Sequence, residues 1–331
     1  MERRVEGDNI IRMNDTVSGH ESPMVSVVMV AYNSERYIDE AISGVVGQRC
    51  RFGVQLVICD DASTDTTPGK VEKWRSLYPE IIDYHRNPHN LGVQTNYLEA
   101  LRHCRGKYIT MCDADDYWCD SSKLRRQVEY MENHPACSLC YHRVVNYYEA
   151  NGEMSLSNGG GAVEQSASGL ASRNTITNLS VMYRASLYDL AALPSWLGEI
   201  RLIDYALHML FASRGEVHYI NRPMGVYRHL PSAIWSQAEA GRRIDMAIAV
   251  RKKLIEYFSD RKELCEPLEK SCVNMVANFE NAKGQPAQRR PLLSRIRGAV
   301  SRLLPRPRPA GEKTLREKTG MFMNKEYDLN G

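Results

Sequence analysis

Three aspartates fall within four positions directly after one apolar stretch. Asp113, Asp115 and Asp116 follow residues 108–112 (YITMC), which have the pattern of a buried strand. One acid after a strand is an ordinary turn residue, whereas three carboxylates repel one another and call for a cation. Mg²⁺ and Mn²⁺ prefer oxygen ligands and often keep a substrate phosphate in their shell. The spacing of Asp113 and Asp115 therefore predicts an open metal site that holds a nucleotide diphosphate.

The alternative is that these acids only form a turn and cap a helix expected at 123–133. A second acidic pair, Asp60 and Asp61, follows another apolar stretch, 54–59 (VQLVIC). Because acids recur at the end of a separate strand, the sequence favours the metal site.

Strands and helices alternate through the first 133 residues. Continuous apolar stretches predict strands, at 24–31, 54–59, 81–84 and 108–112. Apolar residues at helical spacing predict helices, at 38–46, around Trp74, at 93–104 and at 123–133. This alternation predicts an α/β fold with a mostly parallel, Rossmann-like sheet flanked by helices. Ligands of such sheets bind at the carboxyl ends of the strands, where all five aspartates are expected.

The second half of the chain has a less regular pattern. The Gly/Ser-rich residues 158–172 are expected to form a mobile loop. From about residue 238, long helical patterns predict a helical extension. The other predicted elements are strands at 137–148, 177–184 and 217–221 and a helix at 202–212.

Composition and charge exclude several classes of protein. The chain has 331 residues and a net charge of +3, which is too balanced to indicate nucleic-acid binding. No stretch approaches the roughly 18 apolar residues of a membrane-spanning helix, and residues 1–22 lack the apolar core of a signal peptide. The nine cysteines are expected to be reduced thiols. We therefore expect a cytoplasmic protein.

Residues 289–308 form a basic segment, with seven arginines and no acid. Leucine, isoleucine and valine recur there at helical spacing before the chain enters PRPRP. Such a segment either lies on an anionic membrane surface, at the inner face of the cell membrane, or is a solvated, partly disordered tail. The pattern leaves both alternatives open.

Four blocks of the chain, in this order and spacing, closely resemble the family 2 glycosyltransferases. These blocks are VSVVMVAYNSERYIDEAI, LVICDDASTDTT, NLGVQTNYLEAL and GKYITMCDADD. The resemblance covers roughly residues 23–235 and implies the GT-A fold and a nucleotide-diphospho-sugar donor. Together with the composition of the flanking segments, it predicts four parts of the chain: a polar tail (1–22), a glycosyltransferase domain (23–235), a helical extension (236–285) and a basic, partly disordered segment (286–331).

The resemblance assigns donor-site roles position by position. Tyr32 would line the pocket of the nucleotide base, and Asp61 would accept a hydrogen bond from the base. Asp113 and Asp115 match the DxD element, in which Asp113 approaches the ribose and the metal and Asp115 is the principal ligand of Mn²⁺ or Mg²⁺. Three further residues of the family's loop-and-helix block are expected to be structural, namely Asn90, Gly92 and Asn96.

Inverting transfer needs a carboxylate that takes the proton of the acceptor hydroxyl. Asp204 stands at a predicted helix start and on its own would be an N-terminal cap. Its segment resembles the family's GDW block, whose Asp is the base, although Ile203 and Tyr205 replace the Gly and the Trp. Glu199 is the main rival for this role.

The segment GVYRHLPSAIWS resembles the family's closing segment, which often brings a His to the metal. The usual His position, two residues after Arg228, is occupied by Leu230, and His229 follows the Arg directly. Either the loop shifts by one residue and His229 binds the metal, or this ligand is absent. Arg228 can pair with the diphosphate, which a guanidinium matches well.

The favoured function is an inverting, metal-dependent transfer of single sugars to a hydroxyl of a glycan or lipid-linked acceptor, with UDP as the expected nucleotide. Processive relatives carry a QxxRW motif and membrane helices, and neither is found here. Two alternatives stay open: a non-catalytic module that binds sugar nucleotides, and a nucleotidyltransferase. The second is disfavoured because no Gly-rich phosphate loop follows the first strand.

Overall fold

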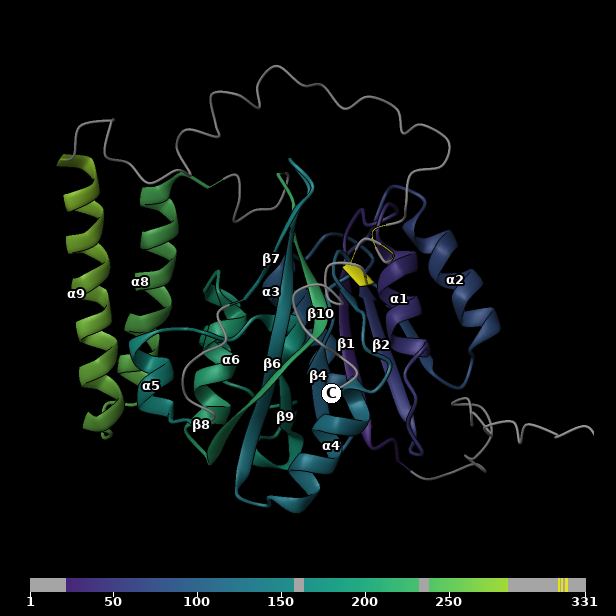
Figure 1. Ribbon diagram of the computed structural model, residues 1–331, viewed down its shortest axis with the longest axis horizontal. Coiled ribbons are helices and arrows are strands. Elements are labelled where there is room, and N and C mark those ends of the chain that lie inside the picture. The colour runs from purple at the N-terminus through teal and green to yellow at the C-terminus, as the bar shows by residue number, and fades with distance from the viewer. Residues whose placement is uncertain are drawn as a thin grey trace, which may run out of the picture. The chain divides into compact units, whose positions relative to one another are not determined.

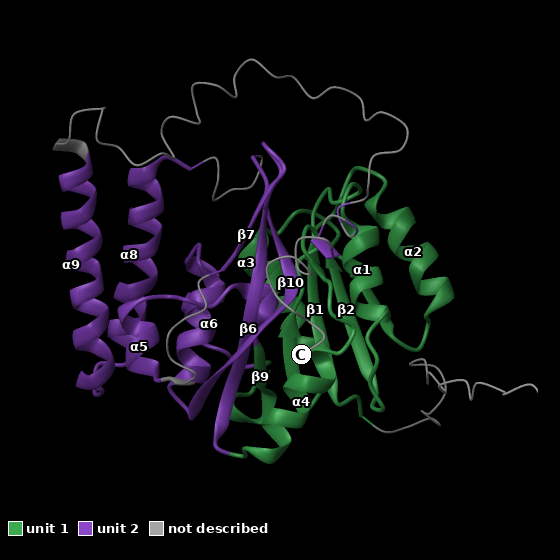
Figure 2. Cartoon of the chain, viewed as in Figure 1, with its two compact units in different colours: residues 1–135, 182–191 green, residues 136–181, 192–331 purple. Residues whose placement is uncertain are grey.

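The computed structural model describes residues 22–157, 164–231 and 238–284, together with Leu315, Glu317, Thr319 and Gly320. Figure 1 shows the described elements. The tail expected at 1–22, except for its last residue, and the basic segment at 289–308 lie outside these residues. The chain divides into two compact units (Figure 2): unit 1 comprises residues 1–135 and 182–191, and unit 2 comprises residues 136–181 and 192–331.

Unit 1 contains a sheet with the strand order β3-β2-β1-β4-β9. The first four strands are parallel and β9 runs antiparallel to β4, so the predicted parallel sheet is confirmed. The central strands β1, β2 and β4 consist almost entirely of buried residues, as expected for strands covered on both faces. The bounds are β1 (Val25–Ala31), β2 (Val54–Asp60), β3 (Ile82–Arg86), β4 (Tyr108–Met111) and β9 (Met182–Arg184).

Four helices complete unit 1. Helix α1 buries an apolar face, and its Gly44 lies so close to the short strand β5 (Tyr117–Trp118) that an added Cβ would be 2.9 Å from the backbone nitrogen of Trp118. A side chain at this position would therefore push β5 away from α1. The helices are α1 (Ile38–Val46), α2 (Thr67–Leu77), α3 (Val93–Arg102) and α4 (Lys123–Asn133), and a short 3-10 helix spans Ala185–Leu187.

Unit 2 contains the long parallel strands β6 (Cys137–Tyr148) and β10 (Glu216–His229). The sequence predicts this strand only over 217–221, and Pro223, which follows, cannot donate to a ladder. The structure continues the strand to His229, and shifts of register on both sides of Pro223 absorb the proline. Two short strands add to this sheet: β7 (Glu153–Leu156) antiparallel to β6, and β8 (Glu164–Gln165) antiparallel to β10.

The helices of unit 2 include the predicted extension. Helix α8 packs against α9, α9 packs against α5, and α6 packs against both α5 and α8. Nine of the ten residues of α6 are buried, so this helix lies in the core. The bounds are α5 (Ala167–Ser172), α6 (Ile203–Ala212), α8 (Ala240–Tyr257) and α9 (Lys262–Gly284), with 3-10 helices at Asn178–Ser180 and Ser195–Glu199.

Two expectations about unit 2 and its neighbouring segments are wrong. Of the loop expected at 158–172, residues 158–163 lie outside the described residues, and residues 167–172 form helix α5 instead, because the Ser166 side chain accepts a hydrogen bond from the Gly169 backbone and Leu170 is fully buried. The strand expected at 177–184 is shorter, since Asn178–Ser180 forms a helical turn and only Met182–Arg184 pairs.

Two expectations from composition agree with the structure. All nine cysteines are free thiols, as predicted. Of the helices in the described ranges, none is both long and apolar enough to cross a bilayer.

Candidate functional site

The residues predicted to do chemistry fall in both units. Tyr32, Asp61, Asp113 and Asp115 belong to unit 1, whereas Asp204, Arg228 and His229 belong to unit 2. Within unit 1 the donor-site candidates all follow strands, and within unit 2 Asp204 lies beside a cavity.

The register of unit 1 brings the ends of β1, β2 and β4 to one edge of its sheet. Ala31 at the end of β1 pairs with Asp60 at the end of β2. Beyond the end of β4, the backbone N–H of Cys112 donates to Val28 O (2.9 Å), and that of Ala114 to Val30 O (3.3 Å). The segment that carries Asp113 and Asp115 therefore runs alongside the end of β1, as the alternation of strands and helices predicts.

Asp113 and Asp115 are each partly exposed at this edge, whereas Asp116 is buried. The hydroxyl of Tyr97, on α3, donates a hydrogen bond to Asp113 Oδ1. This contact is a feature that sequence reasoning missed, although Tyr97 lies inside the third family block. A tyrosine that donates to one carboxylate oxygen fixes the orientation of Asp113 before any ligand binds.

The side chains of Asp113 and Asp115 are of the type that a hard divalent cation takes as ligands. Both side chains offer carboxylate oxygens, which Mg²⁺ and Mn²⁺ prefer. Among the described residues, no group of three or more His, Cys, Asp or Glu side chains is placed to hold a metal ion. Because two carboxylates fill only part of the octahedral shell of Mg²⁺, a cation held by Asp113 and Asp115 would take further oxygens from water or a bound ligand.

Asp61 organises the loop after β3. Its Oδ1 accepts hydrogen bonds from Asn87 Nδ2 (2.9 Å) and the backbone of Leu91 (2.8 Å), and its Oδ2 accepts one from the Gly92 backbone (2.9 Å). The side chain is 3% exposed. Asp61 thus shapes the wall of the candidate donor site, and its predicted bond to a nucleotide base stays a prediction.

The three residues expected to be structural have structural contacts. Asn90 Oδ1 accepts a hydrogen bond from the Gly92 backbone (3.0 Å), and Gly92 has a φ of 84°, which favours glycine. Asn96 is buried, donates to Cys59 O at the end of β2 (2.9 Å) and accepts from Asn87 Nδ2 (2.9 Å). Asn96 therefore ties α3 and the 87–92 loop to the strand that ends at Asp60.

We expect Asn96→Ala to lower the free energy of unfolding by about 2 kcal/mol, because the Cys59 carbonyl loses the hydrogen bond from Asn96 and Asn87 Nδ2 keeps only its bond to Asp61. Urea denaturation followed by circular dichroism measures this change. Asn133→Ala is the matched control, since Asn133 is exposed and its amide donates only to the α4 backbone. Equal losses in the two variants would contradict the role of Asn96.

Tyr32 stands on a turn that ties β1 to β2. The residue is 51% exposed and is therefore accessible to a ligand. The next residue, Asn33, has a φ of 48°, which asparagine tolerates better than most residues. The Asn33 backbone N–H donates to Ser63 Oγ (2.9 Å), and its side chain accepts from the Thr64 backbone (2.8 Å). The ring is thus carried by a rigid turn, as a stacking platform needs.

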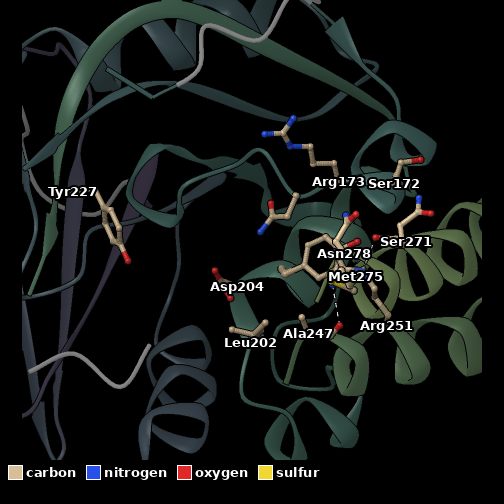
Figure 3. A pocket seen from close by; sticks show the side chains of 13 residues that line it. Ser172, Arg173, Leu202, Asp204, Tyr227, Ala247, Arg251, Ser271, Met275 and Asn278 are labelled. Atoms are coloured by element: carbon tan, nitrogen blue, oxygen red, sulfur yellow. Dashed lines mark hydrogen bonds between the residues drawn. The ribbon is translucent and has the colours of Figure 1, made fainter. Parts of the chain in front are cut away.

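In unit 2, Asp204 lies in the first turn of α6 and lines a cavity of about 580 Å³. The residue before α6 makes no side-chain cap. Figure 3 shows the side chains around this cavity. They come from α5 and the residues after it, from α6, α8 and α9, and from β10: Ser172, Arg173, Asn174, Leu202, Asp204, Tyr205, Tyr227, Ala247, Arg251, Ser271, Asn274, Met275 and Asn278.

The departure from the family pattern at Tyr205 has a structural reason. The Tyr205 hydroxyl donates to the carbonyl oxygen of Leu170 (3.1 Å) and so holds α5 against α6. Burial raises the pKa of Tyr205 to about 12, so the phenol stays protonated at neutral pH. Asp204 is then the acidic side chain that lines this cavity.

Glu199, the rival base, has a different environment. Its carboxylate forms a salt bridge with Lys253 Nζ (2.9 Å), and its side chain is 61% exposed. It does not line the cavity that Asp204 lines. This placement favours Asp204 over Glu199 as the base.

Arg228 and His229 end strand β10. Arg228 is buried and lies opposite Tyr147 of β6. His229 Nε2 lies 3.1 Å from Asn146 Oδ1, and its ring stacks on Tyr148 with centroids 4.3 Å apart. Burial lowers the pKa of His229, which favours the neutral imidazole that a metal requires. Its predicted role as a metal ligand stays a prediction.

His208 lies one turn after Asp204 in α6 and gives this helix a pH dependence. Full burial lowers the pKa of His208 from 6.5 to about 3. Between these two values the unfolded chain binds a proton that the folded chain does not, so the free energy of unfolding decreases as the pH falls from about 6.5 towards 3, by up to about 1.4 kcal/mol per pH unit.

We expect His208→Gln to flatten this dependence, since glutamine takes up no proton in either state. Urea denaturation at several pH values between 4 and 7 gives the slope for each protein. The slope, rather than the stability at one pH, is compared, because the substitution also changes packing. Identical slopes in the wild type and the variant would contradict the burial of a neutral His208.

Comparisons with known proteins come from sequence and from structure. The sequence model of Glycosyl transferase family 2 matches residues 26–189. An uncharacterized protein of Mycobacterium tuberculosis is 36% identical over 225 residues, which are 66% of this chain and 62% of that relative. The chain thus spans less than two thirds of that relative's length.

A second relative carries a functional name. The UDP-Glc:alpha-D-GlcNAc-diphosphoundecaprenol beta-1,3-glucosyltransferase WfaP of Escherichia coli is 28% identical over 133 residues, which are 38% of this chain and 46% of that protein. Among solved structures, the mannosyltransferase PcManGT from Pyrobaculum calidifontis, in complex with GDP-Man and Mn²⁺, superposes with a TM-score of 0.55. It is 18% identical and the match covers 87% of this chain and 82% of that one, which confirms the expected GT-A fold.

Proposed function

Because residues 26–189 of this chain form a Glycosyl transferase family 2 domain, we propose that the protein is an inverting glycosyltransferase that moves one sugar from a nucleotide-diphospho-sugar to a hydroxyl acceptor. The observation that carries this proposal is the placement of Asp113 and Asp115 beside the end of β1, at the edge of the sheet where parallel strands end. The proposed domain within the chain is the predicted one, residues 23–235.

We propose that unit 1 binds the donor. Asp115 and Asp113 would hold Mn²⁺ or Mg²⁺, and the ion, when bound, would neutralise charge that develops on the diphosphate leaving group. The complex of PcManGT with GDP-Man and Mn²⁺ supports a divalent cation and a nucleotide sugar. The name of the E. coli relative supports UDP as the nucleotide. Tyr32 would stack on the base, and Asp61 would accept a hydrogen bond from it.

We propose that Asp204 is the base of the reaction. Its carboxylate would take the proton from the acceptor hydroxyl while that oxygen attacks the anomeric carbon. The bond from the anomeric carbon to the diphosphate breaks, and its electron pair leaves with the nucleoside diphosphate. Arg228 would pair with this anion, and His229 is a further candidate ligand of the metal.

The acceptor is proposed to be a glycan or a lipid-linked sugar in the synthesis of cell-surface polysaccharide or glycolipid. The relative from E. coli is named for an acceptor linked to diphosphoundecaprenol, which supports this class. A lipid-linked acceptor would require contact with a membrane, and we propose that residues 289–308 provide it at the inner face of the cell membrane. The test is co-sedimentation of the protein with anionic liposomes. Loss of co-sedimentation when residues 289–331 are deleted would support this contact, and unchanged co-sedimentation would contradict it.

A donor screen tests the proposed function. The protein is incubated with UDP-, GDP- and dTDP-sugars, with Mn²⁺ or with EDTA, and release of the nucleoside diphosphate is measured. Metal-dependent release from one class of donor is the expected result. Binding of a sugar nucleotide without turnover, with acceptors present, would favour the non-catalytic module instead. Release of inorganic diphosphate would favour a nucleotidyltransferase.

A further inference from the structure

The cavity beside Asp204 carries more positive than negative charge. Its charged lining residues are Asp204, Arg173 and Arg251, and its other lining residues are neutral. One carboxylate against two guanidinium groups leaves a net charge of +1. Its volume of about 580 Å³ falls within the range of about 300–1,000 Å³ that small-molecule sites occupy.

Arg251 is a buried cation with neutral partners. Its side chain is on α8 and is 6% exposed. Its Nε donates to Ser271 Oγ (3.2 Å), and its Nη1 donates to Ala247 O (2.9 Å). The guanidinium lies 4.6 Å from the ring centroid of Tyr205. Each of these three contacts is with a neutral group, so the buried guanidinium has no carboxylate among its direct partners in the described ranges.

Arg173 supplies the second cation from the end of α5. The residue is exposed, and its side chain has no hydrogen bond or ion pair among the residues that the structure describes. Figure 3 shows Arg173 and Asp204 facing the same open space. A guanidinium has five N–H donors in a planar fork, which matches a carboxylate or a phosphate.

The rest of the lining suits a sugar. Ser271, Asn274 and Asn278 recur at helical spacing and present one polar face of α9 to the cavity. Amides and hydroxyls of this kind both donate and accept hydrogen bonds, as sugar hydroxyls require. Tyr227 and Met275 add apolar surface for the face of a sugar ring.

We propose that this cavity binds an anionic acceptor sugar, one that bears a carboxylate or a phosphate. The anion lies against Arg251 and Arg173, the sugar hydroxyls contact the polar face of α9, and one hydroxyl is presented to Asp204. This inference rests on the proposed function in that it takes the cavity for the acceptor site. The extension helices α8 and α9 then select the acceptor, since they supply Arg251 and the amides.

The binding of three small sugars tests this inference without any transfer reaction. The probes are methyl β-glucuronide with a carboxylate, glucose 1-phosphate with a phosphate, and methyl β-glucoside with no charge. Dissociation constants are measured by ligand-observed NMR. We expect one or both anionic probes to bind about tenfold more tightly than the neutral probe, as a charge-assisted pair with a guanidinium gives. The two anionic probes distinguish a uronic acid from a phosphorylated sugar.

The variant Arg173→Gln tests whether the probes bind in this cavity. The chain should still fold, because Arg173 is exposed and its side chain has no partner among the described residues. We expect it to weaken anionic probes about tenfold and to leave the neutral probe unchanged. Arg242→Gln is the matched control, since Arg242 is exposed on α8 and does not line the cavity. Arg251→Gln should have the same effect as Arg173→Gln, with circular dichroism as a check that α8 still folds.

Three results would overturn the inference: no binding of either anionic probe, equal affinity for charged and neutral probes, or equal affinity in the wild type and Arg173→Gln. The proposed function fails in a different way. If no sugar nucleotide is turned over but the charge preference and its loss in Arg173→Gln persist, the anionic sugar site stands and the transferase does not.

Discussion

Asp204→Asn is expected to lower kcat for sugar transfer by about 10²–10⁴-fold, because asparagine keeps the shape of the side chain but cannot take the proton of the acceptor hydroxyl. The donor should still bind with an unchanged Kd, since Asp204 is assigned to the acceptor and not to the nucleotide. Steady-state kinetics with the best donor from the screen, and titration calorimetry with its nucleoside diphosphate, measure the two quantities separately.

Glu199→Gln is the control for this prediction. Glu199 is exposed and paired with Lys253, so its loss should change kcat little. A fall in kcat for Glu199→Gln together with full activity of Asp204→Asn would exchange the roles of these two acids. The His208→Gln variant separates a chemical effect from a folding effect, because it perturbs the same helix without touching the carboxylate.

Asp115→Asn is expected to reduce metal-dependent activity by about 100-fold or more. The amide has no negative charge with which to hold a divalent cation, and the charge stabilisation that such a cation supplies is worth several kcal/mol, at about 1.4 kcal/mol per factor of ten. Electron paramagnetic resonance of Mn²⁺ in the presence of UDP measures the loss of the ion directly.

Glu132→Gln is the matched control for Asp115→Asn. Its carboxylate contacts Lys107 and Tyr108 at the start of β4, the opposite end of the strand from Asp115. This change should leave Mn²⁺ binding unaltered and affect only stability. Retention of Mn²⁺ and of activity in Asp115→Asn would assign the metal to other residues.

Much of unit 1 could be predicted because its signals are local. The valine-rich stretch at 24–31 is a largely buried strand and the VQLVIC stretch a fully buried one, and buried parallel strands have a continuous apolar pattern. Their parallel pairing then requires the residues after them to gather at one edge. The position of Asp113 near the end of β1 follows from these facts alone.

Unit 2 was harder to predict because its elements depend on distant contacts. Helix α5 has a Ser-, Gly- and Ala-rich sequence and becomes ordered by packing on α9 and by the Tyr205 hydroxyl. Strand β10 continues beyond Pro223 because β6 pairs along almost its whole length. Neither of these long-range contacts can be recognised from the pattern of a short stretch of sequence.

The cavity beside Asp204 shows the same limit for a site. In the sequence, Arg251, Asn274 and Asn278 have the pattern of ordinary solvated helix surface. They line one cavity only because α8 packs against both α9 and α6. Asp204 was predicted by its resemblance to a family block. The other side chains that line the cavity belong to no such block.

The most direct measurement of the central claim is a crystal structure of the protein with Mn²⁺ and UDP, with the ion identified by its anomalous scattering. The account predicts one manganese peak within coordination distance of a carboxylate oxygen of Asp115, with the diphosphate of UDP on its other side and the uracil against Tyr32. A manganese–UDP complex elsewhere on the chain, with Asp113 and Asp115 facing only solvent, would contradict it.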